Sequence, residues 1–349
     1  MLLTDNMTKV SHSTDARRWD EFIRSCPQAT TYHQWLWRKA IEETYGHRCH
    51  YLEAVDPAGA IAGVLPLVEM KSSLFGHFLI SLPYFNYGGV VAQTPEAEAE
   101  LLREATSVAQ RCGAEFVELR QGGTIATDWR SIEAKVAMIV ELRGIDAEAY
   151  LKAIGSRLRN KIKHAEKHGL RTAWGGSELL DDFYAVFAEN MRDLGTPVYP
   201  KTWFASVLRH AGDQCRLMCI YDGPKCVAAT LVTRFRDQAE LPWIASTAEA
   251  RKHYSTVLLY WKAIEWALSE KIASVDFGRC SPGSGTYQFK KQWKPREVPL
   301  AWYYHLNRAK AIPEIRPSNP KYRLSIWAWK KLPLFIANRV GPTIVRNIP

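Results

Sequence analysis

The sequence of 349 residues predicts an α+β protein in which helices pack on mixed β-sheets and one such unit occurs twice. Two observations lead to this fold class. Residues 49–65 resemble residues 215–231 without a gap, at a constant offset along the chain. Each segment is then followed by the same series of strand, long helix and buried strand. A repeat of this length indicates a duplicated structural unit.

Each of the two similar segments is predicted to form a β-hairpin. In the alignment Asp56 meets Asp222, and Leu65 meets Leu231. Each aspartate stands in a short turn between two apolar runs, which is the pattern typical of a hairpin.

The remaining elements follow from hydrophobic periodicity. Apolar residues at helical spacing predict two helices before each hairpin. After each hairpin we expect a strand, a long helix and a buried strand. The predicted helices are 16–26, 33–46, about 96–112, 178–195, 200–212 and about 256–271, and the predicted buried strands are 115–119 and 274–278. The full order expected for each copy is helix, helix, hairpin, strand, helix, strand, helix, strand.

The predicted domains are residues 1–144 and 170–306, joined by a basic helical connector at 145–169. A basic, aromatic tail at 307–349 completes the chain. Within it, 321–331 and 332–341 are predicted to be short helices that begin near a proline or end at a glycine. We expect at least one of Trp327 and Trp329 to pack on the second domain. Contact of the basic face with an anionic membrane is the second possibility.

The formal net charge of +10 is concentrated in two segments. Residues 152–171 and residues 311–349 each contain seven Lys or Arg and one acidic residue. This concentration favours an anionic partner, such as a phosphate-bearing substrate, an RNA or an anionic membrane. The alternative is ordinary solvated charge on helix faces.

The seven cysteines include no CxxC pair, so the sequence predicts neither disulfides nor a zinc site. Cys280 is a candidate nucleophile because of its position on a predicted loop, but the sequence shows no adjacent histidine or helix start that would lower its pKa. No apolar run reaches the length needed to cross a bilayer, and no signal-peptide pattern precedes the first helix. We therefore expect the protein in the cytoplasm.

Residues 273–293 are the most informative stretch for function. A half-buried strand, in which Val275 and Phe277 alternate with Asp276, runs into a turn rich in glycine and proline. A short basic and aromatic helix follows, with Thr286 as its expected N-cap. Ligands of open α/β folds bind at such strand ends. The alternative is an ordinary amphipathic helix with a solvated basic face.

The predicted order of elements matches the N-acetyltransferase-like (GNAT) fold, here in two tandem copies. Three further segments are informative, namely RNKIKHAEKHGL, NMRDLGTPVYPKTWF and DFGR…GTYQFKKQW. In these segments and in the duplicated unit, the chain resembles the FemAB family, and within it the exosortase/PEP-CTERM-associated branch. The resemblance implies transfer of an acyl group, classically an amino acid from aminoacyl-tRNA. The acceptor would be an amine of a lipid-linked or nucleotide-linked precursor of the cell envelope, such as peptidoglycan, or of an exopolysaccharide. It implies direct aminolysis without a covalent intermediate, which agrees with the lack of a GxSxG or Walker motif.

The resemblance also implies site residues. Substrate phosphate contacts are expected from Arg38 and Lys39 and from Arg192, with Thr196 in the turn that follows. The expected catalytic residues and two further substrate-binding residues lie in the second copy. The catalytic residues are Tyr260, Arg279, Tyr287 and Lys290, and the substrate-binding residues are Asp276 and Thr286. No metal and no bound cofactor are expected.

The acyl donor stays open between aminoacyl-tRNA and acyl-CoA. The long helical arm of the tRNA-dependent family members is replaced here by the connector. Acyl-CoA is disfavoured, because RKHYST precedes the second long helix without the glycines that bind pyrophosphate in CoA-dependent relatives. The alternatives are an acyl-CoA-dependent N-acyltransferase and a non-catalytic module that binds glycans or precursors during exopolysaccharide assembly.

Overall fold

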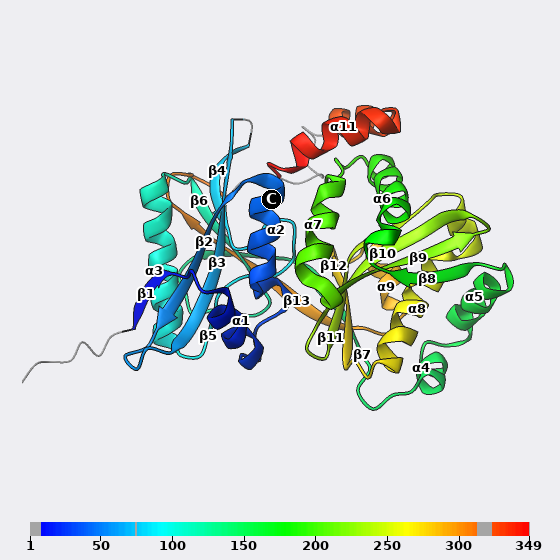
Figure 1. Ribbon diagram of the computed structural model, residues 1–349, viewed down its shortest axis with the longest axis horizontal. Helices are drawn as coiled ribbons and strands as arrows, with labels where there is room; N and C mark the ends of the chain where they lie inside the picture. Colours follow the sequence, from blue (N-terminus) through cyan, green and yellow to red (C-terminus); the bar gives the residue numbers. More distant parts are fainter. Residues whose placement is uncertain (1–7, 74, 313–322, 349) are drawn as a thin grey trace, which may run out of the picture. The chain divides into compact units, whose positions relative to one another are not determined.

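The computed structural model describes residues 8–73, 75–312 and 323–348, and these divide into two compact units (Figure 1). Among the described residues, the first unit contains 8–135, 299–312 and 346–348. The second contains 136–298 and 323–345. The chain leaves the first unit within strand β7 and returns to it within strand β13.

The first unit is built on a sheet with the strand order β1-β2-β3-β4-β6-β13, and β5 pairs with β3. Its elements are β1 (Lys9–His12), α1 (Ala16–Ser25), η1 (Thr31–His33), α2 (Trp35–Tyr45), β2 (Arg48–Val55), β3 (Ile61–Ser72), β4 (Gly76–Ile80), β5 (Val91–Ala92), α3 (Pro95–Cys112), β6 (Phe116–Gln121) and β13 (Arg296–Leu306).

The second unit repeats this order as β8-β9-β10-β11-β12-β7. Its elements are β7 (Arg130–Glu141), α4 (Ala147–Ala153), α5 (Ser156–Lys167), β8 (Arg171–Gly175), η2 (Ser177–Leu179), α6 (Leu180–Leu194), α7 (Lys201–Ala211), η3 (Gly212–Gln214), β9 (Cys215–Asp222), β10 (Lys225–Phe235), β11 (Gln238–Ser246), η4 (Ala250–His253), α8 (Ser255–Ser269), β12 (Ser274–Cys280), α9 (Gly285–Lys291), α10 (Arg323–Lys330) and α11 (Leu334–Val345).

The last strand of each sheet is exchanged between the copies. Strand β7 follows β6 along the chain, yet Val136 pairs with Cys280 of β12. Strand β13 follows β12, yet Leu306 pairs with Phe116 of β6. Each sheet is therefore completed by the strand that follows the other copy in the sequence.

Helices cover both faces of each sheet, because alternate strand residues point to opposite sides. In β2, the ring of Tyr51 contacts Trp19 of α1 and Trp35 of α2, whereas Leu52 belongs to the core beneath α3. In β9 of the second unit, the hydroxyl of Tyr221 donates to Asp182 of α6. Its neighbour Ile220 belongs to the core that includes α8. The two units share this layered arrangement.

Helix α3 shows how local sequence fixes an element. The Thr94 side chain accepts a hydrogen bond from the Ala97 amide at 3.2 Å, and Pro95 occupies the first turn. Gly113 ends the helix in a left-handed conformation with φ 76°. A hydroxyl N-cap, an early proline and a C-terminal glycine are the features that favour this start and this end.

Both predicted hairpins are present, at equivalent positions in the two sheets. Leu52 pairs with Leu65 in the first, and Leu217 pairs with Leu231 in the second. Residues 56–60 connect the first pair of strands but only 223–224 connect the second, so the two registers differ by one residue. The edge strands β1 and β8 were not predicted from the sequence. A helix was expected after β6, but the structure has a loop there; α9 occupies this position only in the second unit.

The compact units differ from the predicted domain boundaries at the connector. Helices α4 and α5 belong to the core of the second unit, because Leu158 and Ile162 point inward from the amphipathic α5. The hydroxyl of Tyr150 in α4 donates to the carbonyl of Trp293 at 2.7 Å. The basic residues of the connector therefore lie on the outer face of a packed helix.

The tail helices α10 and α11 pack against α6. A Cβ at Gly195 would lie 2.5 Å from Ile326 Cγ2, and one at Gly341 would lie 2.9 Å from the Val198 amide nitrogen, so glycine is required for both close contacts. Trp329 is half-buried and Trp327 is exposed, which agrees with the expected packing of one tryptophan. Helix α11 runs beyond its predicted end at Gly341. Residues 313–322 of the predicted tail lie outside the described residues.

None of the helices in the described part of the chain is both long enough and apolar enough to span a membrane.

Candidate active site at the parting strands

Two neighbouring strands separate near the middle of the second sheet. Strands β11 and β12 are parallel and pair only from Gln238 opposite Ser274 to Glu240 opposite Asp276. Beyond this point β11 continues along β10, while β12 continues along β7. Strands β4 and β6 of the first unit also form a short parallel pair. Parting strands leave backbone groups without a ladder partner, which makes this position suitable for ligands.

A β-bulge marks the point where β12 leaves β11. The register of β12 against β7 shifts between Asp276 and Arg279, and Gly278 adopts φ 74°. The Asp276 carboxylate accepts a hydrogen bond from the Gly278 amide at 2.7 Å and so fixes the bulge. Glycine is favoured here, because its positive φ would strain a residue with a side chain.

Lys290 of α9 binds the carbonyls on this bulge. Its Nζ donates to the carbonyl oxygens of Gly278 and Arg279 at 3.0 and 3.1 Å, and the residue is buried. Burial lowers the pKa of Lys290, although the negative charges of Asp276 and Glu240 oppose this shift. The predicted site lysine is thus an interior ammonium group at the parting strands.

Glu240 is a candidate site residue that sequence analysis missed. It is buried and lies directly opposite Asp276 at the last paired position before the strands separate. The available signal was a single acidic residue within the apolar run AELPWIAS. A buried carboxylate beside a buried lysine is a candidate general base.

Tyr260 lies in α8, within a cluster of aromatic side chains. Its ring packs against Phe277, Phe289 and Trp293, with centroid separations of 4.6, 5.1 and 5.8 Å. Burial raises the pKa of Tyr260. This predicted catalytic residue is therefore part of an aromatic core under the bulge.

Arg279 and Tyr287 lie nearer to solvent. Arg279 is exposed, and its carbonyl is one of the two that Lys290 binds. The Tyr287 hydroxyl donates to Glu297 at 2.9 Å and accepts from Lys291 at the same distance. Tyr287, which was predicted to be catalytic, is therefore a half-buried residue in a hydrogen-bond network at the surface.

Two local predictions around α9 were wrong. The N-cap is Ser284, whose hydroxyl accepts from the Tyr287 amide at 3.2 Å, whereas Thr286 is exposed inside the first turn. Either hydroxyl can cap a helix, and the backbone conformation selects the earlier one. Cys280 is the buried last residue of β12 rather than a loop residue.

Arg192 lies at the end of α6 and pairs with Asp193 at 2.8 Å. Thr196 is exposed in the next turn, on the segment that receives the tail helices. Within the described residues, no hydrogen bond or ion pair joins Arg192 to Lys290. Their shared role in acceptor binding stays a prediction.

Helix α8 follows the C-terminal end of β11, the end at which β11 no longer pairs with β12. Tyr254 adopts φ 59° before the helix, and no side chain caps the first turn. The Ser255 hydroxyl is fully buried and has no hydrogen-bond partner within the described residues. Amide groups at a helix start, together with an unpartnered hydroxyl, can bind a phosphate group.

The basic helix α5 borders this helix start. Lys161 Nζ lies 5.9 Å from the centre of the Tyr254 ring and 3.2 Å from Oε1 of Gln292, the residue that follows α9. The ring of His164 contacts that of Tyr254 at 5.3 Å. One side of the predicted basic connector therefore adds positive charge at the N-terminus of α8.

Residues 154–291 match the family model described as Acetyltransferase (GNAT) domain. This range contains the parting strands, α8, the bulge and Lys290. The second unit contains a GNAT-type domain.

Solved structures extend the likeness across both units. FemX matches at 14% identity and a TM-score of 0.67, covering 90% of this chain and 99% of its own. The C-terminal domain of a putative lysylphosphatidylglycerol synthetase from Agrobacterium fabrum matches at 12% identity and a TM-score of 0.58, covering 85% and 92%. A tandem GNAT protein from the clavulanic acid biosynthesis pathway matches at 11% identity and a TM-score of 0.54, covering 87% and 100%. The predicted tandem GNAT fold is confirmed. None of the curated protein sequences compared with the chain gives a significant match.

A hollow of about 550 Å³ lies on the GNAT-type domain between α5, β8 and α8. Leu258, Lys262 and Trp266 of α8 form one wall, and Glu166 and Trp174 form the other. None of the site residues predicted from the sequence lines this hollow. It begins one turn beyond Ser255 and continues along α8 away from the N-terminus of this helix.

Arg38 and Lys39 lie in the first unit, on α2. The Arg38 guanidinium lies 4.7 Å from the centre of the Trp35 ring and donates to Glu42 at 3.0 Å and to the Ser13 carbonyl at 3.2 Å. Lys39 is exposed. Arg38 therefore joins α2 to the segment before α1, and the predicted phosphate contact of these residues stays a prediction.

Proposed function

We propose that the protein is an acyltransferase that moves an amino acid or another acyl group onto an amine. The proposed acceptor is a lipid-linked or nucleotide-linked precursor of the cell envelope or of an exopolysaccharide. The observation that carries this proposal is the pair of buried groups, Lys290 and Glu240, at the parting strands of a GNAT-type domain. The same domain contains the N-terminus of α8, which is suited to donor phosphates.

The proposed reaction is direct aminolysis. The donor phosphates bind at the N-terminus of α8 and Lys161, and the acyl carbon lies between β11 and β12. The acceptor nitrogen attacks this carbon, and Glu240 takes the proton that the amine loses. The bond to the donor oxygen or sulfur breaks, and the donor takes up a proton and leaves as its free hydroxyl or thiol. Lys290 holds the bulge and provides positive charge near the developing oxyanion.

Two donors fit the helix start. The basic side of α5 suits the phosphates of aminoacyl-tRNA. One observation also favours acyl-CoA as a second candidate. The segment RKHYST contains no glycine, yet Tyr254 adopts the left-handed conformation before α8. No side chain caps the first turn of this helix, so its first amides are available to a phosphate group. The absence of glycine is therefore a weaker argument against CoA than the sequence suggested.

Donor binding tests the proposal. Calorimetry with the full chain would compare coenzyme A with an aminoacyl-tRNA, and transfer would be measured to a nucleotide-linked muropeptide that carries a free amine. Replacing Lys161 with Gln is expected to weaken binding of the preferred donor by about tenfold to a hundredfold, since a charged hydrogen bond contributes about 1.5–3 kcal/mol. Lys163→Gln is the matched control, because this lysine is exposed on the same helix.

Equal binding by the Lys161 and Lys163 variants would contradict the donor position. Loss of transfer in Glu240→Gln with donor binding retained would support the proposed base. Acceptor binding without turnover for either donor would favour the non-catalytic module.

Two observations support a lipid-linked acceptor. One similar structure is named a putative lysylphosphatidylglycerol synthetase, a name that describes an aminoacylated lipid. On this chain, Leu324, Trp327 and Phe335 are exposed on the tail helices. Arg339 of α11 and Lys331, between the two helices, are also exposed. Exposed aromatic and basic residues together favour contact with an anionic membrane surface. The exosortase/PEP-CTERM association stays a prediction from the sequence.

Liposome flotation tests the membrane contact. We expect the protein to float with anionic vesicles and much less with neutral ones, since each basic residue near an anionic surface contributes about 1 kcal/mol. The double variant Trp327→Ser/Phe335→Ser is expected to lose this binding without unfolding, because both side chains are exposed. Point variants are preferable to deletion of the tail, which would uncover Gly195 and Val198 on the second unit. Unchanged flotation of the double variant would remove the membrane role.

A further inference from the structure

Five potential metal ligands gather at one corner of the first unit. His12, His50 and His77 are three of the ten histidines of the chain, and Glu69 and Cys112 lie beside them. They come from four strands and from the end of α3. Their separations along the sequence give no recognisable motif, which explains why the sequence predicted no metal site.

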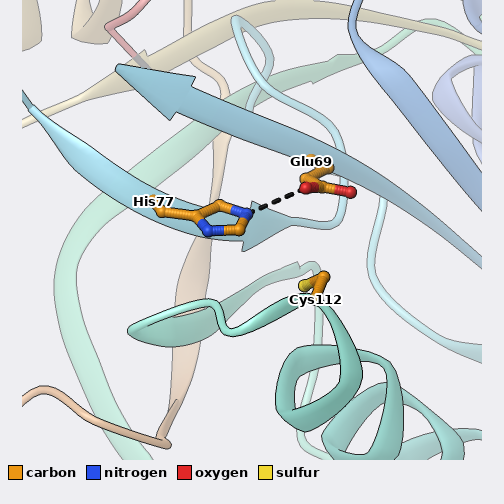
Figure 2. A group of neighbouring side chains, drawn as sticks. All are labelled: Glu69, His77 and Cys112. Carbon is orange, nitrogen blue, oxygen red and sulfur yellow. Dashed lines mark hydrogen bonds and ion pairs between the residues drawn. The ribbon is translucent and has the colours of Figure 1, made fainter. Parts of the chain in front are cut away.

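Glu69 is the centre of the group (Figure 2). Its Oε1 accepts from His77 Nε2 at 2.9 Å, and its Oε2 accepts from His50 Nε2 at 3.1 Å. Both carboxylate oxygens of Glu69 therefore face imidazole nitrogens, which orients this side chain within the group.

Cys112 completes a set of three ligand types. One ligand atom from each of Glu69, His77 and Cys112 lies within 4.8 Å of the other two. Figure 2 shows the Cys112 side chain below Glu69 and His77, at the end of its helix. In a tetrahedral zinc site, bonds of about 2.0–2.3 Å place ligand atoms roughly 3.3–3.8 Å apart, so small side-chain rotations suffice.

We infer that Glu69, His77 and Cys112 form a binding site for Zn²⁺ or a similar transition metal, with solvent as the fourth ligand. The mixed carboxylate, imidazole and thiolate set favours such ions over Mg²⁺ and Ca²⁺. Binding releases the thiol proton of Cys112 and leaves His77 neutral, with its proton on the nitrogen that does not bind the metal.

The surroundings of the three ligands fit a cation. Cys112 is the last residue of the 18-residue helix α3, and the C-terminal end of a helix attracts positive charge. His50 bonds the second oxygen of Glu69 and so orients this ligand, as outer-sphere partners commonly do. Arg48 pairs with Glu69 in the neighbouring strand β2, and its positive charge repels a cation. The side chains of Glu69 and His77 are each 15% exposed, so an ion can enter without unfolding.

A bound ion would join β3, β4 and the end of α3. The neighbouring strands β3 and β4 are separated in sequence from the end of α3 by the segment that contains β5 and most of α3. An ion that binds only the folded form stabilises it by mass action, so the site is expected to stabilise the first unit. This role is independent of acyl transfer in the second unit.

The experiment uses the full chain, without a purification tag, after treatment with a chelator and dialysis. Calorimetry with Zn²⁺ is expected to give one ion per chain, and thermal unfolding is expected to shift upward with Zn²⁺ but not with Mg²⁺. Co²⁺ is expected to give a thiolate charge-transfer band that Cys112→Ser lacks. Cys226→Ala is the matched control, because this buried cysteine lies in the second unit.

Variants separate the ligands from their support. Cys112→Ser and His77→Asn are expected to abolish stoichiometric binding, and His50→Gln to weaken it by about 10- to 100-fold. Folding of each variant is checked by its unfolding transition without metal. No binding of Zn²⁺ at micromolar concentration would overturn the assignment. Binding that Cys112→Ser leaves unchanged would overturn it as well.

Discussion

Replacement of Lys290 by methionine is expected to lower the rate of acyl transfer by about 100- to 1000-fold, the usual effect of removing a preorganised electrostatic group. The Nζ of this lysine binds the carbonyls of Gly278 and Arg279, which shape β12 where it leaves β11. Methionine retains much of the side-chain volume but provides neither charge nor hydrogen bonds. The measurement is single-turnover transfer from the donor that binds.

Lys291→Met is the matched control for this prediction. Lys291 is adjacent in sequence, but its side chain is 55% exposed and pairs with Glu297 on the surface. Its replacement is expected to change stability little and to leave transfer nearly unchanged. Equal losses of activity in the two variants would contradict a special role for Lys290.

The pH dependence of stability provides a second test of Lys290. Burial lowers its pKa below the ordinary value of 10.5. Between the folded pKa and 10.5 the unfolded chain binds the proton more readily, so the free energy of unfolding gains a contribution that rises with pH in this window. The Lys290→Met variant is expected to lack this rise. Denaturant titrations at several alkaline pH values would measure the difference between the two proteins.

Replacement of Arg120 by methionine is expected to destabilise the first unit by about 3–5 kcal/mol, because it leaves Glu118 buried without its partner. Arg120 Nε donates to Glu118 at 2.7 Å, and Arg120 Nη1 donates to the Phe85 carbonyl at 2.7 Å. The side chains of the ion pair are 2% and 6% exposed. The guanidinium also lies 4.4 Å from the centre of the Trp302 ring in β13.

Urea denaturation with probes for each unit would measure this loss, since two units can unfold in separate transitions. The double variant Glu118→Leu/Arg120→Met is expected to lose less than Arg120→Met alone, because it removes the unpaired charge. Arg103→Met, which affects an exposed ion pair with Glu100, should change stability little. A loss below about 1 kcal/mol for Arg120→Met would show that Glu118 finds water or another partner.

Local features of this protein were determined by the sequence itself. The periodicity of apolar residues located the main helices and both hairpins, because helix and strand each place side chains with a fixed repeat. The repeat between residues 49–65 and 215–231 revealed the duplication. Lys290 was also accessible from the sequence, since a basic helix directly after a strand and a glycine-rich turn is a local pattern. The choice between Ser284 and Thr286 as N-cap was not, because two nearby hydroxyls differ only in the backbone conformation around them.

Only the tertiary structure decided which distant elements pair. The exchange of β7 and β13 depends on hydrogen bonds between strands far apart in the chain. The residue pattern of each strand does not indicate which strand it pairs with. The same holds for Glu240 opposite Asp276 and for Cys112 beside Glu69 and His77. Their side chains meet because strand register and helix packing bring them together. Such contacts are set by the sum of long-range packing energies, and a single sequence carries no local signal for them.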